Sequence, residues 1–419
     1  MPELNFTEKI GGSCTVKKRL FLIPVLIAVM ILNIAKVAEV SAENFGEKYK
    51  LNQIVILSRH NIRTPFVEGS KVPAGFLTNL GGVLEVENGQ YFREYLKNEG
   101  LLPEIYSPAP GEIRFYANSY QRTIATAKYF SSGMFPNTNI ETEYRYKINE
   151  KDPVFLEHLP NNVNEKFYKA IDEKFEKIGG IQPTVDYVNS RLPALLKAMK
   201  LKKMTDANIP KKYSAKDVEP SKKWVKTEKF QPAIIAADTL IMNHYADLVA
   251  GVKDKLTEED WQKISDISYL GQYSYSDFPE YSLFRSRNML KLINDELETE
   301  GRKFTFLCGH DTNLSTVLSA LGVEDYTAPK SLITKTPIGG KIVIEKRIDD
   351  FGREFIDVNL VYQSTRQIQN LEFLSADNPP MILPLNFKGI KRNEDGLYTA
   401  KDFKKLLTDK IAEYDTFVD

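Results

Sequence analysis

Cysteine is almost absent from this chain, which contains two cysteines among its 419 residues. Cys14 lies in an N-terminal segment that we expect to be removed, so the mature protein would keep Cys308 alone. A single cysteine excludes an internal disulfide framework, and stability must come from the apolar core, which a chain of this length can form. We interpret Cys308 as a small buried hydrophobic residue; a reactive thiol is the alternative.

An excess of charge of either sign is also absent, because 56 lysines and arginines balance 56 aspartates and glutamates. A balanced surface has no broad basic region that would attract nucleic acid or an anionic membrane, so neither is expected as a partner. The one unbalanced stretch, 197–229, contains eleven lysines and four acids. We interpret it as a solvated excursion of the chain, with attraction of anionic substrates as the alternative.

Histidine is rare as well, with four residues in the chain. His158 and His244 have no cluster of cysteine, aspartate or glutamate around them at the spacing of metal ligands. We expect both to be surface or helix-packing residues. The sequence therefore predicts no metal site and no other cofactor.

Long apolar runs are limited to one, from Leu20 to about Ala35, which follows the basic residues Lys17–Arg19. Small residues at Val40–Ala42 then provide a cleavage site, which completes the three-part pattern of a secretory signal peptide. The run is shorter than the roughly 20 residues that a membrane-spanning helix needs. We expect residues 1–42 to be a signal peptide and the mature protein to be periplasmic or secreted, with no stable membrane association. An uncleaved membrane anchor is the alternative.

Short apolar strands alternate with amphipathic helices near both ends of the mature chain. This alternation predicts an α/β fold with a mixed, mostly parallel sheet flanked by helices. We expect strands at Ile54–Leu57, Ile113–Ala117, Lys303–Leu307, Lys341–Lys346 and Phe355–Tyr362, the last two joined by a turn near 349–352. We expect helices at Gly89–Asn98, Gln121–Phe130 and Thr312–Leu321.

The pattern changes between about residues 137 and 300, where long helical stretches replace the strands. We therefore expect a discontinuous α/β catalytic domain, 43–136 and 301–419, with a smaller all-α domain, 137–300, inserted into it. This insertion is expected to cover the site and to shape its specificity.

Two motifs follow predicted strands. Ser58–Pro65 comes directly after Ile54–Leu57, and Cys308–Asn313 comes directly after Phe304–Leu307. In an α/β sheet, ligands bind beyond the carboxyl ends of the strands, so both motifs stand where a site is expected.

The first motif places His60 between two arginines, Arg59 and Arg63. Buried like charges are costly unless an anion compensates them, and we infer that the anion is the substrate. Planar guanidinium groups match phosphate oxygens, and neighbouring arginines favour the neutral, nucleophilic form of a histidine. Phosphoryl transfer also requires help for the leaving oxygen, for which Asp311 in the second motif is the natural general acid. A structural role for His60 beneath the sheet edge is the alternative.

The Arg-His-x-x-Arg-x-Pro segment with a distant His-Asp pair resembles the histidine acid phosphatases, the branch of the histidine phosphatase superfamily that includes bacterial phytases. The match is closer still to periplasmic glucose-1-phosphatases. It extends over most of the chain from about Leu51 to Tyr398 and is weakest between about 137 and 300. Asn61 stands where phytases usually carry glycine. Further matching segments are Leu77–Thr78, Gly81–Glu85, Ala117–Ser119, Gln121–Thr123, Thr336–Lys341 and Val361–Ser364.

The resemblance implies a phosphoric monoester hydrolase in which His60 is the phosphorylated nucleophile and Asp311 the proton donor. It implies that the substrate phosphate is held by four residues, Arg59, Arg63, Arg122 and His310. These four supply the countercharge, so no metal is expected, and the partner is a small phosphomonoester.

We expect a secreted histidine acid phosphatase similar to the glucose-1-phosphatases and acting on sugar phosphates. A phytase or a broad-specificity acid phosphatase is the alternative within this class. A non-catalytic phosphate-binding protein would need neither a nucleophile nor a proton donor. A mutase of the same superfamily is disfavoured by the signal peptide and by the His-Asp pair.

Three of these residues have alternative roles. Arg122 could close a surface ion pair. Asp311 could serve only as the N-cap of a helix that starts at Thr312, because aspartate is favoured at that position. His310 could be the acid in place of Asp311, and the adjacency of the two leaves this choice open.

Overall fold

The computed structural model describes residues 45–66, 73–155, 159–202, 208–217, 220–221, 224–225 and 228–419. The predicted signal peptide, 1–42, and His158 lie outside these residues. Leu51–Asp419 form one compact unit. Across the described residues, no helix has both the length and the apolar character of a membrane span.

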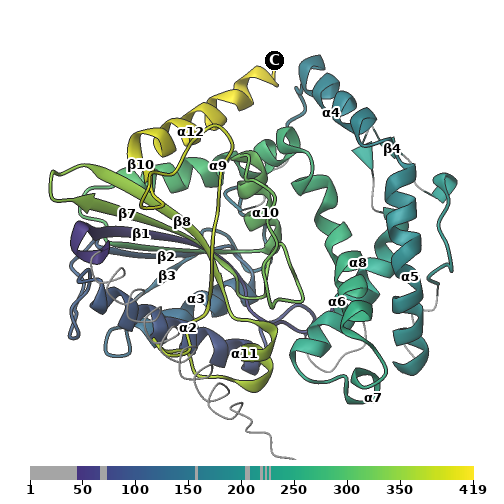
Figure 1. Ribbon diagram of the computed structural model, residues 1–419, viewed down its shortest axis with the longest axis horizontal. Helices are drawn as coiled ribbons and strands as arrows, with labels where there is room; N and C mark the ends of the chain where they lie inside the picture. The colour runs from purple at the N-terminus through teal and green to yellow at the C-terminus, as the bar shows by residue number, and fades with distance from the viewer. Residues whose placement is uncertain are drawn as a thin grey trace, which may run out of the picture. The chain divides into compact units, whose positions relative to one another are not determined.

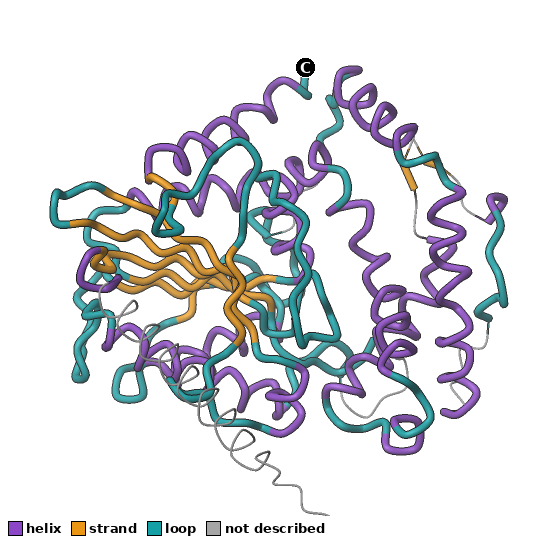
Figure 2. The backbone as a smooth tube through the Cα atoms, in the orientation of Figure 1, coloured by secondary structure: helices purple, strands orange, loops and turns teal. Residues whose placement is uncertain are grey.

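A mixed sheet forms the centre of this unit (Figures 1 and 2). Its strands are β1 (Tyr49–Arg59), β2 (Ile113–Ala117), β3 (Thr142–Glu143), β6 (Phe304–Gly309), β7 (Lys341–Asp349), β8 (Glu354–Tyr362), β9 (Met381–Pro384) and β10 (Tyr398–Thr399). They follow in the order β10-β8-β7-β1-β6-β2-β3, and β9 pairs with β8. The β1, β6, β2 and β3 strands pair in parallel, whereas β7, β9 and β10 pair with β8 antiparallel. The predicted α/β fold with a mixed, helix-flanked sheet is confirmed.

The apolar run Ile54–Leu57 forms the middle of β1 and is fully buried. Successive side chains of a strand point to opposite faces of the sheet. Ile54 and Ile56 accordingly belong to the apolar cluster on one face, and Val55 and Leu57 to the cluster on the other. A strand covered on both faces requires such a continuous apolar run, which explains why the sequence pattern identifies it.

Helices cover both faces of the sheet (Figure 1). One face carries α2 (Asn79–Asn98) and α3 (Gln121–Met134), which contribute to the same apolar cluster. The other face carries α9 (Pro279–Glu298), α10 (Asp311–Ala320) and α12 (Ala400–Glu413).

Two glycines allow α2 and α3 to approach closely. A Cβ atom on Gly89 would collide with the backbone carbonyl of Phe130, and one on Gly133 with the carbonyl of Val86. This close contact fixes the C-terminal part of α3 against α2, whereas Arg122 lies in the first turn of the same helix.

Between β3 and β6 the described chain is mainly helical. The helices that precede α9 are α4 (Glu165–Lys177), α5 (Gln182–Lys202), α6 (Gln231–Tyr245), α7 (Ala250–Lys253) and α8 (Glu258–Ser276). The same region contains the two-stranded pair β4 (Pro220–Ser221) and β5 (Trp224–Val225).

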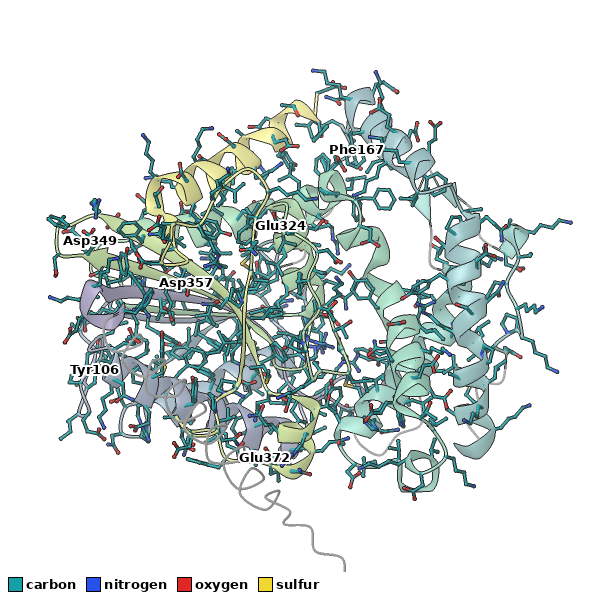
Figure 3. The ribbon with its side chains drawn as sticks, viewed as in Figure 1. Tyr106, Phe167, Glu324, Asp349, Asp357 and Glu372 are labelled. Atoms are coloured by element: carbon teal, nitrogen blue, oxygen red, sulfur yellow. The ribbon has the colours of Figure 1, made fainter. Side chains whose placement is uncertain are left out.

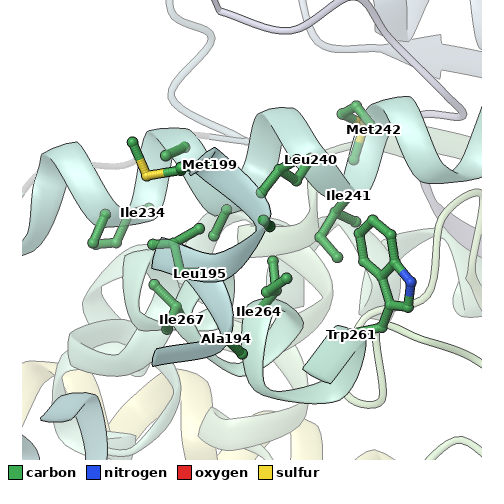
Figure 4. Close-up of a cluster of buried hydrophobic side chains, with 14 of the residues drawn as sticks. Ala194, Leu195, Met199, Ile234, Leu240, Ile241, Met242, Trp261, Ile264 and Ile267 are labelled. Carbon is green, nitrogen blue, oxygen red and sulfur yellow. The ribbon is translucent and has the colours of Figure 1, made fainter. Parts of the chain in front are cut away.

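An apolar core lies between α5, α6 and α8, and Leu195, Ile241 and Ile264 are part of it (Figure 4). Ile62 and Ile338 from the sheet region belong to the same cluster. The helical region and the sheet region therefore share apolar contacts. The division into an α/β domain and an inserted domain at 137–300 stays a prediction, since α9 lies within that range but packs on the sheet.

The β7–β8 hairpin has its turn at the predicted place. Asp349, labelled in Figure 3, accepts the backbone N–H groups of Phe351 at 3.0 Å and Arg353 at 2.9 Å through Oδ1. A short helix, α11 (Thr365–Asn370), follows β8.

Candidate active site

The register of two central strands brings the two sequence motifs together. Ser58 pairs with Cys308, and Arg59 pairs with Gly309, across the parallel strands β1 and β6. The backbone N–H of His60 donates to the carbonyl of Gly309 at 3.0 Å. The segments that follow the two strands therefore lie side by side, at the carboxyl ends where α/β sheets bind their ligands.

His60 is buried, with 3% of its surface exposed. Its Nδ1 lies 2.8 Å from the backbone carbonyl oxygen of Asn61, and because a carbonyl can only accept, Nδ1 carries the ring proton. Nε2 therefore keeps its lone pair. Burial lowers the pKa of His60 well below its usual range, and the nearby Arg122 lowers it further. The ring is thus held neutral with Nε2 available as a nucleophile.

Arg59 is buried at the end of β1. Its Nη1 donates to the carbonyl of Thr336 at 2.5 Å, and its Nη2 lies 3.2 Å from Oδ2 of Asp311. Burial lowers the pKa of Arg59 from its ordinary value, and the Asp311 carboxylate opposes that shift. Arg59 and Asp311, predicted from separate motifs, are thus direct neighbours.

Asp311 is the first residue of α10, and His310 occupies the N-cap position. Asp311 is therefore not the helix cap, although its Oδ1 accepts the backbone N–H of Thr312 at 2.8 Å. Its side chain is 28% exposed, so it can exchange a proton with water. This access to solvent suits a residue that donates and then recovers a proton.

A hydrogen-bond donor of His310 lies close to a hydrogen-bond donor of Arg122. Asn118 Nδ2 lies 2.8 Å from His310 Nε2, and Asn118 Oδ1 accepts the N–H of Ser119 at 2.9 Å, which fixes the orientation of the amide. His310 Nε2 is then an acceptor, so the ring proton is on Nδ1. Arg122 Nη2 lies 3.3 Å from this Nδ1. The N–H groups of Arg122 Nη2 and His310 Nδ1 are therefore both donors at close range. An oxygen atom that accepts hydrogen bonds from both would remove their mutual repulsion.

Burial affects the protonation of both Arg122 and His310. Burial lowers the pKa of Arg122 to about 10, so the guanidinium stays cationic at neutral pH. Burial also lowers the pKa of His310 well below its usual range, followed by the effect of Arg122. His310 is therefore a neutral N–H donor beside a cation. Arg122 closes no surface ion pair among the described contacts; its ring neighbour is Tyr120, 4.8 Å from its Cζ.

Arg63 is held by a residue that the sequence does not predict. Its Nη2 donates to both carboxylate oxygens of Asp238, at 2.9 and 3.0 Å. Its Cζ also lies 3.9 Å from the ring centroid of Phe66. Asp238 belongs to α6 in the helical region, where the sequence shows only the spacing of a buried helix. Its place at the site depends on how α6 packs, for which a single sequence carries no signal.

A pocket of about 220 Å³ opens beside these residues. Arg59, Arg63 and Asp311 from the two motifs line it, whereas His60, Arg122 and His310 are not among its lining residues. The helical region supplies nine further lining residues, Gln231, Ile234, Ile235, Asp238, Ser265, Ser268, Tyr269, Gly271 and Gln272.

The remaining histidine and cysteine described are both buried. His244 packs on Trp261, with ring centroids 4.1 Å apart, as expected for a helix-packing residue. Cys308 is a free, fully buried thiol, as predicted. Over the described ranges of the chain, no group of three or more His, Cys, Asp or Glu side chains is arranged to hold a metal ion.

Comparison with known proteins gives the same picture at the level of the family. The model of the histidine phosphatase superfamily (branch 2) matches residues 68–363. A glucose-1-phosphatase of Providencia rettgeri is 30% identical over 388 residues, which cover 87% of this chain and 92% of that protein. A glucose-1-phosphatase of Salmonella typhimurium is 28% identical, over 93% of this chain and 98% of that protein.

Among solved structures, the phytase of Citrobacter braakii superposes with a TM-score of 0.75. The aligned part covers 86% of this chain and 97% of the phytase, with 22% sequence identity. This similarity shows that the two proteins share a fold.

Proposed function

Since the chain belongs to the histidine phosphatase superfamily (branch 2) and is a phosphoric monoester hydrolase, we propose that it hydrolyses sugar phosphates through a phosphohistidine formed on His60. In the first step the lone pair of Nε2 attacks phosphorus, and the bond from phosphorus to the ester oxygen breaks. Asp311 gives its proton to the departing alkoxide. In the second step Asp311, now a carboxylate, takes a proton from water, whose oxygen attacks phosphorus and releases Nε2.

The observation that carries this proposal is the approach of two donors, Arg122 Nη2 and His310 Nδ1, to 3.3 Å. A phosphate oxygen between them would accept from both and would remove an unfavourable contact. Arg59 and Arg63, which line the 220 Å³ pocket, add two further guanidinium groups. Such fixed donors stabilise the charge on a phosphoryl group in transfer, which is the main requirement of this reaction.

A sugar monophosphate suits the part of the pocket that the helical region lines, from Gln231 to Gln272, which we call the outer wall. Among the described residues that line it, Arg59 and Arg63 are the only cations, and both belong to the phosphate-binding group. The outer wall provides side chains such as Gln231, Ser268 and Tyr269, which can bond to sugar hydroxyls. Asp238 adds a carboxylate there, which would repel a second phosphate group on the same substrate.

Two alternatives remain distinct from this proposal. A phytase acts on an inositol carrying many phosphates, which would favour additional cations in the outer wall over the carboxylate of Asp238. A non-catalytic phosphate-binding protein would have no use for a neutral histidine with a free Nε2 or for a partly exposed acid beside it. Both features support a hydrolase.

We also propose that the enzyme acts in the periplasm or outside the cell. The pattern of residues 1–42 supports this proposal, with a basic start, an apolar core and small residues at the expected cleavage point. N-terminal sequencing of the exported protein would be expected to begin at Glu43. A retained N-terminus in the membrane fraction would contradict it.

A parallel assay on three substrates tests the proposed function. We expect kcat/KM to be highest on glucose 1-phosphate, lower on p-nitrophenyl phosphate and lowest on phytate. His60→Ala should abolish hydrolysis of all three without loss of the folded state. A preference for phytate would contradict the sugar-phosphate proposal, and an active His60→Ala variant would contradict the phosphohistidine.

A further inference from the structure

Three buried polar side chains form a hydrogen-bonded chain beneath the nucleophile, and the reaction steps above do not use them. Asn61 Nδ2 donates to Oε1 of Glu85 at 2.7 Å, and Lys341 Nζ donates to the same oxygen at 3.1 Å. The side chains of Glu85 and Lys341 are 0% exposed. The three residues come from separate parts of the fold, the loop after β1, helix α2 and the first position of β7.

A charge pair in such a position does little for stability. Removing two charges from water is costly, and apolar side chains of similar size commonly stabilise a fold as well or better. Burial raises the pKa of Glu85, while the charge of Lys341 and the hydrogen bonds from Asn61 and Lys341 oppose the shift. We therefore explain the Glu85–Lys341 pair by the neighbouring groups that it holds in place, and not by a contribution to the stability of the fold.

The group that it positions is one peptide unit. Asn61 Oδ1 accepts the backbone N–H of Ile62 at 2.8 Å, while the carbonyl of the same peptide accepts the Nδ1–H of His60 at 2.8 Å. The amide of Asn61 thus holds one end of the peptide whose other end orients the nucleophile. Glu85 fixes that amide in turn, and Lys341 fixes Glu85.

The start of β7 is shaped around this arrangement. Gly339 has φ +62°, and a Cβ there would come within 2.6 Å of Asn61 Nδ2. Lys341 Nζ also donates to the carbonyl of Gly339 at 2.7 Å, and the carbonyl of Gly340 accepts the N–H of Arg59 at 2.8 Å. Only glycine at 339 leaves space for the asparagine amide in this backbone conformation.

We propose that Asn61, Glu85 and Lys341 form a positioning triad for His60. The triad holds the 61–62 peptide so that its carbonyl keeps the proton on Nδ1 and leaves Nε2 free to attack phosphorus. This role rests on the proposed phosphohistidine reaction and adds to it a source for the tautomer and the orientation of the ring.

The direct test is nitrogen NMR of the histidine side chains in the substrate-free enzyme. The chain has only four histidines, so the His60 signals can be assigned by comparison with His60→Ala. We expect a pure Nδ1–H tautomer in the wild type and a mixture of both tautomers in Asn61→Gly. Because no substrate is present, this readout does not depend on whether His60 is ever phosphorylated, which the His60→Ala assay decides separately.

The kinetic test uses a rescue. We expect Asn61→Gly to lower kcat by roughly 10- to 100-fold, because a misplaced reacting group costs about that much. KM should change by less than about threefold, since the arginines that bind phosphate are unaltered. Lys341→Met should also lower kcat by leaving Glu85 without its countercharge, and Glu85→Gln in the same chain should recover most of it. This double variant also contains no unpaired buried charge and so serves if Lys341→Met alone does not fold.

Asn88→Ser provides a matched control. Asn88 is a buried amide on the same helix as Glu85, and its two side-chain hydrogen bonds go to Leu84 and Gln363 and to neither Asn61 nor Lys341. We expect this variant to lose stability but to keep the wild-type tautomer and kcat. Wild-type tautomer and kcat in Asn61→Gly would overturn the proposal. Failure of Glu85→Gln to improve kcat over Lys341→Met would overturn the link through Glu85.

Discussion

Asp311→Asn removes the proposed proton donor and leaves its surroundings in place. The new side chain has the same shape, and its Oδ1 can still accept the N–H of Thr312, which lies 2.8 Å away in the native protein. The contact with Arg59 at 3.2 Å loses its charge, and although the Asp311 side chain is 28% exposed, the guanidinium of Arg59 is buried and loses its countercharge. We expect the free energy of unfolding to fall by roughly 1–3 kcal/mol, because the amide oxygen still accepts a hydrogen bond from the buried guanidinium.

The effect on catalysis should be much larger and should depend on the leaving group. General acid catalysis contributes roughly 10²- to 10⁴-fold, or about 3–5 kcal/mol of barrier, when the leaving group is a poor one such as a sugar alkoxide. For p-nitrophenyl phosphate, whose phenolate leaves without a proton, the first step should slow by less than about tenfold.

Rapid mixing separates the two steps. In the proposed reaction Asp311 is also the base of the second step, so Asp311→Asn should lower the steady-state rate on both substrates. The comparison must therefore use the first turnover. A matched control is Asp266→Asn, because Asp266 pairs with Arg191 at 2.8 Å, is 21% exposed and does not line the pocket. Equal first-turnover losses on glucose 1-phosphate and p-nitrophenyl phosphate would refute the role of Asp311 as the acid.

Three further predictions concern the pocket, pH and packing. Asp238→Asn removes the carboxylate that engages Arg63 and faces the pocket, so kcat/KM on phytate should rise relative to glucose 1-phosphate by roughly three- to thirtyfold; an unchanged ratio in the parallel assay would exclude a role in selectivity. The pKa values of His60 and His310 are lowered in the folded protein, so the unfolded chain takes up protons first as the pH falls below about 6.5. The free energy of unfolding, measured in urea without phosphate, should therefore fall with decreasing pH in this range, and less steeply in His60→Ala; a steeper fall in that variant would contradict the assignment. Gly133→Ala forces a methyl group against the carbonyl of Val86 and should destabilise the fold by about 1–3 kcal/mol, seen as a lower midpoint of thermal unfolding, whereas Gly251→Ala, at a glycine without a positive φ and with no atom within 4 Å of the added methyl group, provides a control for loss of a glycine.

The parts of the fold that the sequence predicts are those with a local cause. Ile54–Leu57 and Phe304–Leu307 are recognisable as strands because burial on both faces requires continuous apolar runs. His60 and Asp311 are recognisable as a pair because each lies within a few residues of the end of such a strand. The parallel register of β1 and β6 then brings the two segments together.

The parts that the sequence does not predict depend on long-range packing. Asp238 reaches Arg63 across 175 positions of the chain, and α6 carries no motif that marks one of its residues. Glu85 and Lys341 lie in segments that match the family, but their contact with Asn61 appears only when α2 and β7 are placed against the same loop. The short strands β3, β9 and β10 pair at or near the sheet edges and contain too few residues for a periodic pattern.

The most direct measurement of the central claim is the chemical state of His60 during turnover. Enzyme mixed with labelled glucose 1-phosphate and quenched in base within milliseconds should carry phosphate on Nε2 of His60, and the label should be lost on brief treatment with acid. Labelled phosphate on a residue other than His60 would contradict the account. So would the absence of labelled phosphate from both the active wild-type enzyme and the Asp311→Asn variant.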